Sequence, residues 1–451
     1  MVTIALVSNP LKLRIDKLVM GGFGLGRFED GLVVLVPHVL PGETVLVQPL
    51  KKKKSYLHAR LVDVLEPSSD RVSPPCRYYG RCGGCDFQHI NSDLQSKVKN
   101  NILFEHMVRA GVLFPDDEKA LLPPGQPENY FRYRQRIRLH VDKNGVPGYH
   151  RYHSHTLEPV KSCPLAVSQL DDIFSQCLKS ESFLQLLERY TNQIELQYSA
   201  YDNTVVLFIH RERKSSKSEI RLADQLVSEH ISFKAIIFTS PGNQPEILAR
   251  EKQGVFSAVQ LGFDQPLPDG ETMRLQFEAG GFCQVNQEQN TVLINYLLDW
   301  AALSGKERVL DLFCGMGNFT LPLARKAESA TGLDLKRSSI RSARKNGEIN
   351  HILNCKFSQE TALQGIKKIV AVGEKFDLVL LDPPRQGCAD VIPYLPETGA
   401  RTVIYISCDP ATLSRDLLLL KGHGYVVDKM KMIDMFPQTH HMETMVKLLK
   451  L

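Results

Sequence analysis

Three apolar runs in the last third of the sequence end at an aspartate. Asp311 closes "RVLD", Asp334 closes "TGLD", and Asp382 follows "FDLVLL". Segments of helical composition separate these runs, and strands that alternate with helices form a mostly parallel, doubly wound sheet. The carboxyl ends of such strands meet at one edge, where open α/β sheets bind ligands. We therefore predict an α/β fold with such a sheet over residues 281–451, and a ligand crevice beside the three acids.

A glycine-containing turn follows the first of these acids. Gly315 and Gly317 lie where a helix is expected to begin, and glycine there lets the backbone approach a ligand closely. Thr320 breaks the G-x-G-x-x-G pattern, which disfavours a cofactor bound through pyrophosphate. An acid after the second strand, here Asp334, suits ribose hydroxyls. The pattern favours a cofactor crevice with a ribose contact.

A cysteine stands at the end of a further strand, in "VIYISCDPATLSRD". The run 403–406 has the composition of a buried strand, and Pro410 prevents the strand from continuing into the helical segment that follows. Cys408 is therefore predicted at a sharp strand-to-helix turn on the crevice edge. Two interpretations remain open from the residues alone: a nucleophile, or a small buried packing residue.

Residues 1–66 contain short apolar runs separated by turns, which predicts a small OB-like β-barrel. The glycines in "GGFGLGR" fit a hairpin bend, because Arg27 stands where a dinucleotide-binding loop requires glycine. Lys51–Lys54 form a basic run that is either a solvated face or a phosphate contact. A proline-marked boundary, "EPSSDRVSPPC", separates this barrel from a mixed α/β central domain, 67–280.

The central domain begins with closely spaced cysteines. Cys76, Cys82 and Cys85 follow a C-x5-C-x2-C pattern in a glycine-containing loop, and thiolates at that spacing bind zinc or an iron–sulfur cluster. Cys163, which precedes a proline, is our candidate for the fourth ligand, with His89 as the weaker rival. The spacing predicts a metal site without choosing between zinc and iron–sulfur.

Arginines alternate with other residues in "FRYRQRIRLH". In a strand, Arg132, Arg134, Arg136 and Arg138 would share one face. Guanidinium groups bind phosphate bidentately, and the nearby aromatic residues suit stacking on unpaired bases. We predict an RNA contact here; the alternative is a solvated strand face with salt bridges. The aromatic residues are Tyr130, Phe131, Tyr149 and Tyr152.

The composition is that of a globular protein with more than one domain. The chain has 451 residues, 43% of them hydrophobic and 23% charged, with a formal net charge of +5. It has no apolar run of the roughly 18 residues that a membrane span requires, and its N-terminus lacks a signal-peptide pattern. Its ten cysteines argue for metal binding or catalysis rather than disulfides. We expect a cytoplasmic protein without membrane contact.

Two family resemblances add to these patterns. The segment "LVMGGFGLGRFEDGLVVLVPHVLPGETV" resembles a TRAM domain, an OB-like RNA-binding barrel. The C-terminal region resembles the class I S-adenosylmethionine methyltransferases, and more closely the RNA uracil-C5 methyltransferase family. With the barrel and four cysteines, it is most similar to the family's bacterial 23S rRNA members. The matching motifs are "FCQVN", "DLFCGMGNF", "LDPPRQG", "SCDPATLSRD" and "MFPQTHHMETM".

This resemblance implies a reaction and assigns residues to it. The implied reaction is methyl transfer from S-adenosylmethionine to carbon 5 of a 23S rRNA uridine, which is unpaired or flipped from its stack. Cys408 would add to carbon 6 and make carbon 5 nucleophilic, and Glu443 would then remove the carbon 5 proton. A helix N-terminus would favour the Cys408 thiolate. The implied cofactor contacts are Gln284, Phe313, Asn318, Asp334 and Asp382.

The resemblance also implies a [4Fe-4S] cluster on Cys76, Cys82, Cys85 and Cys163, and nothing in the sequence requires more than a monomer. One position departs from the family: Asp409 replaces the usual Asn after the nucleophile, and an ionised carboxylate facing Cys408 would raise its pKa. Three alternatives remain: a tRNA uracil-C5 methyltransferase, a non-catalytic RNA-binding assembly protein, and a zinc-ribbon nucleic-acid binder.

Overall fold

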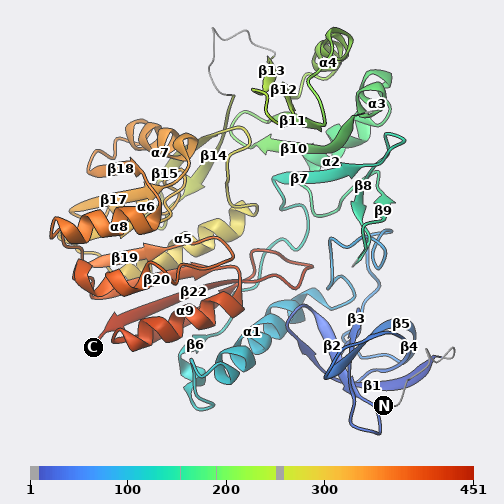
Figure 1. Cartoon of the computed structure of the whole chain (residues 1–451), viewed down its shortest axis with the longest axis horizontal. Coiled ribbons are helices and arrows are strands. Elements are labelled where there is room, and N and C mark those ends of the chain that lie inside the picture. Colours follow the sequence, from blue (N-terminus) through green and yellow to red (C-terminus); the bar gives the residue numbers. More distant parts are fainter. Residues whose placement is uncertain (1–9, 153, 189, 250–258) are drawn as a thin grey trace.

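The computed structural model describes residues 10–152, 154–188, 190–249 and 259–451 (Figure 1). Its first five strands close into a barrel in the order β1-β2-β3-β5-β4. Alternate residues of β3 and β4, among them Val34 and Val47, point inward and are fully buried. The predicted OB-like barrel is confirmed. The strands are β1 (Leu11–Val19), β2 (Phe23–Arg27), β3 (Val33–Pro37), β4 (Thr44–Lys52) and β5 (Tyr56–Glu66).

The glycines of the barrel serve its first hairpin, as the sequence predicted. Gly21 and Gly22 have φ of +85° and +76° in the turn between β1 and β2. A Cβ on Gly24 would lie 2.2 Å from Cγ2 of Val39, and one on Gly26 would lie 2.3 Å from the carbonyl oxygen of Arg14. Side chains at these two positions of β2 would therefore clash with neighbouring residues.

A seven-stranded central sheet follows, in the order β13-β12-β11-β10-β7-β8-β9. All its neighbouring strands are antiparallel except β11 and β12. Its elements are β7 (Arg136–Val141), β8 (Pro147–His150), β9 (Leu157–Pro159), α2 (Ser168–Cys177), α3 (Glu181–Leu187), β10 (Thr191–Ser199), β11 (Thr204–Arg211), α4 (Lys217–Glu229), β12 (Phe233–Thr239) and β13 (Glu246–Ala249). The hairpin β14 (Gln260–Pro266) and β15 (Thr272–Glu278) leads from this sheet to the C-terminal region.

The C-terminal sheet has eight strands in the order β18-β17-β16-β19-β20-β22-β21-β6. The five strands from β18 to β20 are parallel, whereas β22 runs antiparallel to both of its neighbours. Its elements are α5 (Gln287–Ala301), β16 (Arg308–Asp311), α6 (Thr320–Ala324), β17 (Ser329–Asp334), α7 (Arg337–Ile349), β18 (Cys355–Gln359), α8 (Ala362–Ala371), β19 (Leu378–Leu381), the 3-10 helix η2 (Ile392–Thr398), β20 (Thr402–Ser407), α9 (Pro410–Gly422), β21 (Tyr425–Ile433) and β22 (Glu443–Lys450).

Both faces of this sheet are buried under helices, as a doubly wound fold requires. On β20, Val403 and Tyr405 pack into one hydrophobic cluster with residues of α8 and α9. The alternate residues Ile404 and Ile406 pack into a second cluster with α5, α6 and α7. The predicted α/β class with a mostly parallel sheet is confirmed. Within the described ranges, every helix is too short or too polar to span a bilayer.

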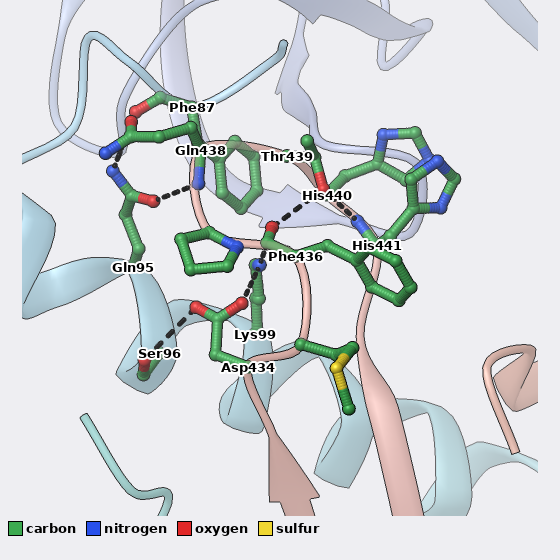
Figure 2. Close-up of polar contacts among 12 residues, drawn as sticks. Phe87, Gln95, Ser96, Lys99, Asp434, Phe436, Gln438, Thr439, His440 and His441 are labelled. Atoms are coloured by element: carbon green, nitrogen blue, oxygen red, sulfur yellow. Dashed lines mark hydrogen bonds and ion pairs between the residues drawn. The ribbon is translucent and has the colours of Figure 1, made fainter. Parts of the chain in front are cut away.

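Helix α1 (Ser92–Arg109) and strand β6 (Leu121–Leu122) attach the barrel end of the chain to this sheet, with the short 3-10 helix η1 (Asp117–Lys119) between them. β6 pairs in parallel with β21 at the sheet edge. The Lys99 ammonium on α1 lies 2.6 Å from a carboxylate oxygen of Asp434, just after β21, and both side chains are fully buried (Figure 2). A third group, the Ser96 hydroxyl, donates to the same carboxylate.

Removing one partner of this ion pair is expected to destabilise the protein strongly. Lys99→Met leaves the Asp434 carboxylate buried without its cation, which costs about 3–5 kcal/mol. The double variant Lys99→Met/Asp434→Leu removes both charges and is expected to recover most of that loss. Chemical unfolding of both variants measures the difference. A double variant no more stable than the single one would contradict this account of the pair.

Candidate active site and cysteine site

Three acids meet at the carboxyl edge of the parallel strands, as the sequence predicted. Burial raises the pKa of Asp311 to about 7, and Asp334 contributes in the same direction. Burial also raises the pKa of Asp382 to about 7, with Asp311 adding to the effect. The carboxyl groups therefore lie close enough for their charges to interact. Asp311 itself has a structural role, because it accepts hydrogen bonds from the Thr320 hydroxyl at 2.6 Å and the Phe313 amide at 3.2 Å.

The loop after β16 is open toward this edge. Gly315 has φ of +54°, and a Cβ there would meet nothing within 4 Å. Its amide donates to Asp334 at 3.1 Å, and the half-exposed Asp334 also accepts from the Lys336 amide at 2.7 Å. These contacts fix the carboxylate of Asp334 beside a backbone that a ligand can approach.

The other predicted cofactor residues flank this loop. Asn318 exchanges two side-chain hydrogen bonds of 2.9 Å with Asn290 on α5. Gln284 lies in the segment between β15 and α5 with its side chain largely buried. Phe313 follows the Asp311 turn and packs against the core on the α8 and α9 side. The fold therefore brings helix α5 and the β16 loop to one edge of the sheet.

The register of β20 and β22 brings Cys408 and Glu443 together. Ser407 is the last residue of β20 and pairs with Thr444 on the antiparallel β22. Cys408 comes directly after Ser407, and Glu443 comes directly before Thr444, so the two residues leave their strands at the same end of the sheet. Cys408 is half-buried and Glu443 is buried. Residues 35 positions apart in the sequence thus become neighbours.

The charges around Cys408 oppose formation of its thiolate. Burial, followed by the nearby Glu443 carboxyl, raises the pKa of Cys408 to about 11. Burial raises the pKa of Glu443 well above its ordinary range, and Asp382 acts in the same direction. The Arg385 guanidinium acts against both shifts. The helix N-terminus was expected to favour the Cys408 thiolate, yet burial and the neighbouring acids leave the pKa of this thiol raised.

Arg385 is a site residue that the sequence reasoning missed. It lies in the motif "LDPPRQG", three positions after Asp382. The motif therefore contained the signal for Arg385, but the sequence predicted a role for Asp382 alone. The Arg385 carbonyl accepts from the Thr412 hydroxyl at 2.9 Å, which ties the loop 382–388 to the first turn of α9. Asp409 caps this helix by accepting from the Thr412 amide at 2.9 Å. The unusual carboxylate after Cys408 therefore serves as an N-cap.

Four cysteines line a second cavity, in the central region. They are Cys76, Cys82, Cys85 and Cys163, together with Tyr78, Tyr149 and Arg134 among others. All four are free and half-buried. Burial raises the pKa of Cys82 to about 11, and Cys163 and Cys76 add to that shift, so these thiols are near neighbours. The fold therefore gathers the four cysteines that the sequence reasoning grouped.

His89, the rival fourth ligand, is not among the residues that line this cavity. Its Nδ1 is 2.6 Å from the Tyr79 hydroxyl, and its Nε2 is 3.3 Å from the Val39 carbonyl oxygen. Within the described part of the chain, no group of three or more His, Cys, Asp or Glu side chains is arranged to hold a single metal ion. A four-iron cluster does not require its four thiolates to converge on one ion, because each thiolate binds a different iron around a larger core.

The row of arginines differs from its prediction. Only Arg136 and Arg138 belong to β7, and both pair with the buried Glu195 on β10. Arg132 has φ of +57° and pairs with Asp171 at 2.8 Å. Arg134 turns into the cysteine cavity, where its buried Nε has no hydrogen-bond partner. The prediction of four guanidiniums on one strand face is wrong. Three of the four arginines instead form salt bridges, which was the alternative to an RNA contact.

The raised pKa of Cys408 predicts its reactivity in the free protein. Alkylation of Cys408 should increase with pH up to about 11, because the thiol is protonated below that value. Arg385→Gln should move the midpoint higher by removing the cation that favours the thiolate. Peptide mass spectrometry after timed alkylation measures this, with Lys356→Gln on β18 as the control. A midpoint near that of an ordinary cysteine, unchanged in Arg385→Gln, would contradict the site electrostatics.

Comparisons with known proteins agree with this architecture. The family model described as tRNA (Uracil-5-)-methyltransferase matches residues 126–451, and the TRAM domain model matches residues 11–62. The chain is 34% identical over 449 residues to the 23S rRNA (uracil(1939)-C(5))-methyltransferase RlmD of Tolumonas auensis, covering 98% of this chain and 96% of that protein. It is 32% identical over 442 residues to the protein of the same name from Vibrio vulnificus, covering 97% and 96%.

A solved structure has the same fold over nearly the whole chain. It is the Pyrococcus abyssi tRNA (uracil-54, C5)-methyltransferase in complex with S-adenosyl-L-homocysteine, which matches with a TM-score of 0.71 at 22% identity. The match covers 97% of this chain and 100% of that one. The family model covers most of the chain, and full-length relatives exceed 30% identity. The chain therefore belongs to the uracil-5 RNA methyltransferase family.

Proposed function

We propose that this protein transfers a methyl group from S-adenosylmethionine to carbon 5 of a uridine in 23S rRNA. The observation that carries the proposal is the position of Cys408 beside Glu443, at the end of β20 with Asp382 and Arg385 nearby. The names of the full-length relatives support 23S rRNA as the substrate.

Cys408 is the nucleophile in this proposal. Carbon 5 of uracil is a poor nucleophile, so the Cys408 sulfur first bonds to carbon 6 and the ring becomes an enolate. The attack requires the thiolate, so the thiol proton must pass to solvent water before the sulfur–carbon bond forms. Arg385 is the cation at the site that favours this ionised state. A thiolate with a high pKa is also intrinsically more nucleophilic than an acidic one.

Glu443 is the base that completes the reaction. Carbon 5 takes the methyl group as the sulfur–methyl bond of S-adenosylmethionine breaks and S-adenosylhomocysteine leaves. The Glu443 carboxylate then removes the carbon 5 proton. The electron pair of that bond re-forms the carbon 5–carbon 6 double bond and expels the Cys408 thiolate. Burial and Asp382 raise the pKa of Glu443, which strengthens it as a base once it is ionised.

S-adenosylmethionine supplies the methyl group, and the sheet edge has residues suited to hold it. Asp334 offers a half-exposed carboxylate for ribose hydroxyls, next to the open backbone of Gly315. In this proposal the cofactor is also contacted by residues of the neighbouring loops: Asn318, Gln284, Phe313 and Asp382.

RNA would reach this site along the barrel and the cysteine segment. Half-buried aromatic rings form a chain from Tyr56 through His58, Phe23 and Tyr152 to His38, with ring centroids 5.2 to 6.4 Å apart. Such rings stack on unpaired bases. The exposed Lys51–Lys54 lie at the end of β4 on the same barrel and supply charge for phosphates. The target uridine would be unpaired or flipped into the crevice.

A [4Fe-4S] cluster is our proposal for the cysteine cavity. Four free thiols line it, as such a cluster requires, and the buried, unpartnered Nε of Arg134 offers a positive group for the negative charge of thiolate ligands. We assign the cluster a structural role in docking RNA.

The division of the chain into 1–66, 67–280 and 281–451 follows from these roles: RNA-binding barrel, cluster and RNA-binding region, and methyltransferase region. We propose that the protein acts in the cytoplasm as a monomer.

Methylation of rRNA fragments by variants that each replace one cysteine tests the function. With S-adenosylmethionine and unmodified 23S rRNA fragments, the wild-type protein should form 5-methyluridine, detected by nucleoside mass spectrometry. Cys408→Ala should lose this activity completely, whereas Cys355→Ala on β18 should keep it. Formation of 5-methyluridine in tRNA but not in rRNA would show that the substrate is tRNA. Full activity of Cys408→Ala would show that Cys408 is not the nucleophile.

Iron content tests the cysteine cavity. Purified under exclusion of air, the wild-type protein should be brown, with about four irons per chain. Cys163→Ala should lose colour and iron, while Cys177→Ala, a buried cysteine of α2, should keep both. S-adenosylmethionine binding should stay intact when the cluster is removed, and RNA binding should weaken. A colourless protein that contains one zinc ion per chain would contradict the assignment of an iron–sulfur cluster to this cavity.

A further inference from the structure

The segment that leads to the proposed base has little regular structure of its own. Residues 434–442, which we call the base loop, join β21 to β22 and directly precede Glu443, the first residue of β22. Gln438 at its centre has φ of +69°, in the left-handed region. Within the loop, the Phe436 carbonyl accepts from the amide and hydroxyl of Thr439 at 3.2 and 2.8 Å. Its conformation therefore depends heavily on contacts with other parts of the chain.

The strongest of these contacts come from the segment directly after Cys85. The Gln438 carbonyl accepts from the amides of Asp86 and Phe87, at 3.1 and 3.0 Å. In return, the Asp86 carboxylate accepts from the His440 amide at 3.1 Å and lies 2.6 Å from His440 Nδ1. Asp86 is buried, and His440 is about one-third exposed. The hydrogen bonds run in both directions between two segments about 350 residues apart.

Helix α1 holds the other side of the base loop. The Gln95 side chain donates to the Gln438 side chain at 3.0 Å and accepts from the Gln438 amide at 2.9 Å (Figure 2). Gln95 also donates to the Phe87 carbonyl, so it joins both segments. Lys99 donates to the Phe436 carbonyl at 3.0 Å.

The barrel reaches the same point. A Cβ on Gly22, in the turn between β1 and β2, would lie 2.9 Å from Cβ of His440 and 3.0 Å from Cε1 of Phe87. The barrel turn, the cysteine segment and the base loop are therefore in direct contact, which leaves the loop little room to move.

We propose that Asp86, through its hydrogen bonds with His440, is a positioning residue for the Glu443 carboxylate, so that the cysteine segment holds the catalytic base in place. The inference rests on the proposed function and deepens it. His440 lies three residues before Glu443, and a displacement of the loop there changes the direction from which the carboxylate approaches carbon 5 of the base. Attack by Cys408 does not depend on this loop, because Cys408 follows β20.

This separation predicts a specific defect. If Glu443 is misplaced, Cys408 still adds to the base and carbon 5 still receives its methyl group, but the carbon 5 proton remains. The thiolate cannot leave until that proton is removed, so protein and methylated RNA stay covalently joined. A merely destabilising change would instead slow every step, including the first methyl transfer.

The test compares Asp86→Ala and His440→Ala with wild type on ordinary uridine-containing rRNA fragments. Both variants should transfer methyl at nearly the wild-type rate in the first turnover. Steady-state turnover should then fall about 10- to 100-fold, which is the effect of displacing a reacting group by about 1 Å. A denaturant-stable complex of protein and methylated RNA should accumulate on gels, and Asp86→Asn, which keeps an acceptor oxygen for the His440 amide, should recover part of the turnover.

Controls separate this inference from loss of the cysteine site and from failure of the proposed function. Glu219→Gln removes a carboxylate paired with Arg211 on β11, away from the base loop, and should show no stalled complex. Iron content should match wild type in His440→Ala, which leaves the cysteine segment unchanged. The double variant Asp86→Ala/His440→Ala should equal either single one if the pair acts as a unit. Wild-type release rates in His440→Ala would overturn the inference, whereas absence of methylation by wild type would overturn the proposed function.

Discussion

The antiparallel insertion of β22 between β20 and β21 is the constraint on which the site depends. In a wholly parallel sheet, the residue after β20 and the residue that begins the last strand would lie at opposite edges. Because β22 runs the other way, its first residue, Glu443, lies where β20 releases Cys408. A shift of one residue in this register would turn Glu443 to the other face of the sheet. The buried, fully paired interior of the sheet fixes the register, so the hydrophobic core determines the distance between Cys408 and Glu443.

The same packing creates an electrostatic cost. Cys408, Glu443 and Asp382 share one desolvated site, and the pKa of Cys408 rises to about 11 although the Arg385 guanidinium acts against the shifts of Cys408 and Glu443. A protonated thiol protects the free protein from adventitious oxidation and alkylation, since the thiolate is the reactive form. In the function proposed above, the Cys408 thiol must therefore lose its proton before it attacks the base.

The sequence predicted the sheet, the barrel and the grouping of the four cysteines because each leaves a local signal. Acids after apolar runs mark strand ends, "GGFGLGR" marks a hairpin, and closely spaced cysteines mark a shared loop. It did not predict contacts made by tertiary packing. Arg136 and Arg138 were expected to face RNA, yet their partner Glu195 lies on a strand more than 50 residues away. The contact between Asp86 and His440, and the shift in the Cys408 pKa, likewise depend on which distant residues become neighbours.

The central claim is that Cys408 forms a covalent bond with the target base. Trapping with 5-fluorouridine-substituted 23S rRNA fragments and S-adenosylmethionine tests it most directly, because fluorine at carbon 5 cannot leave as a proton does and the adduct accumulates. We expect a denaturant-stable complex in wild type, with peptide mass spectrometry locating the RNA on Cys408, and no complex in Cys408→Ala. A complex that persists in Cys408→Ala, or the absence of any complex from a wild-type protein that methylates uridine, would contradict it.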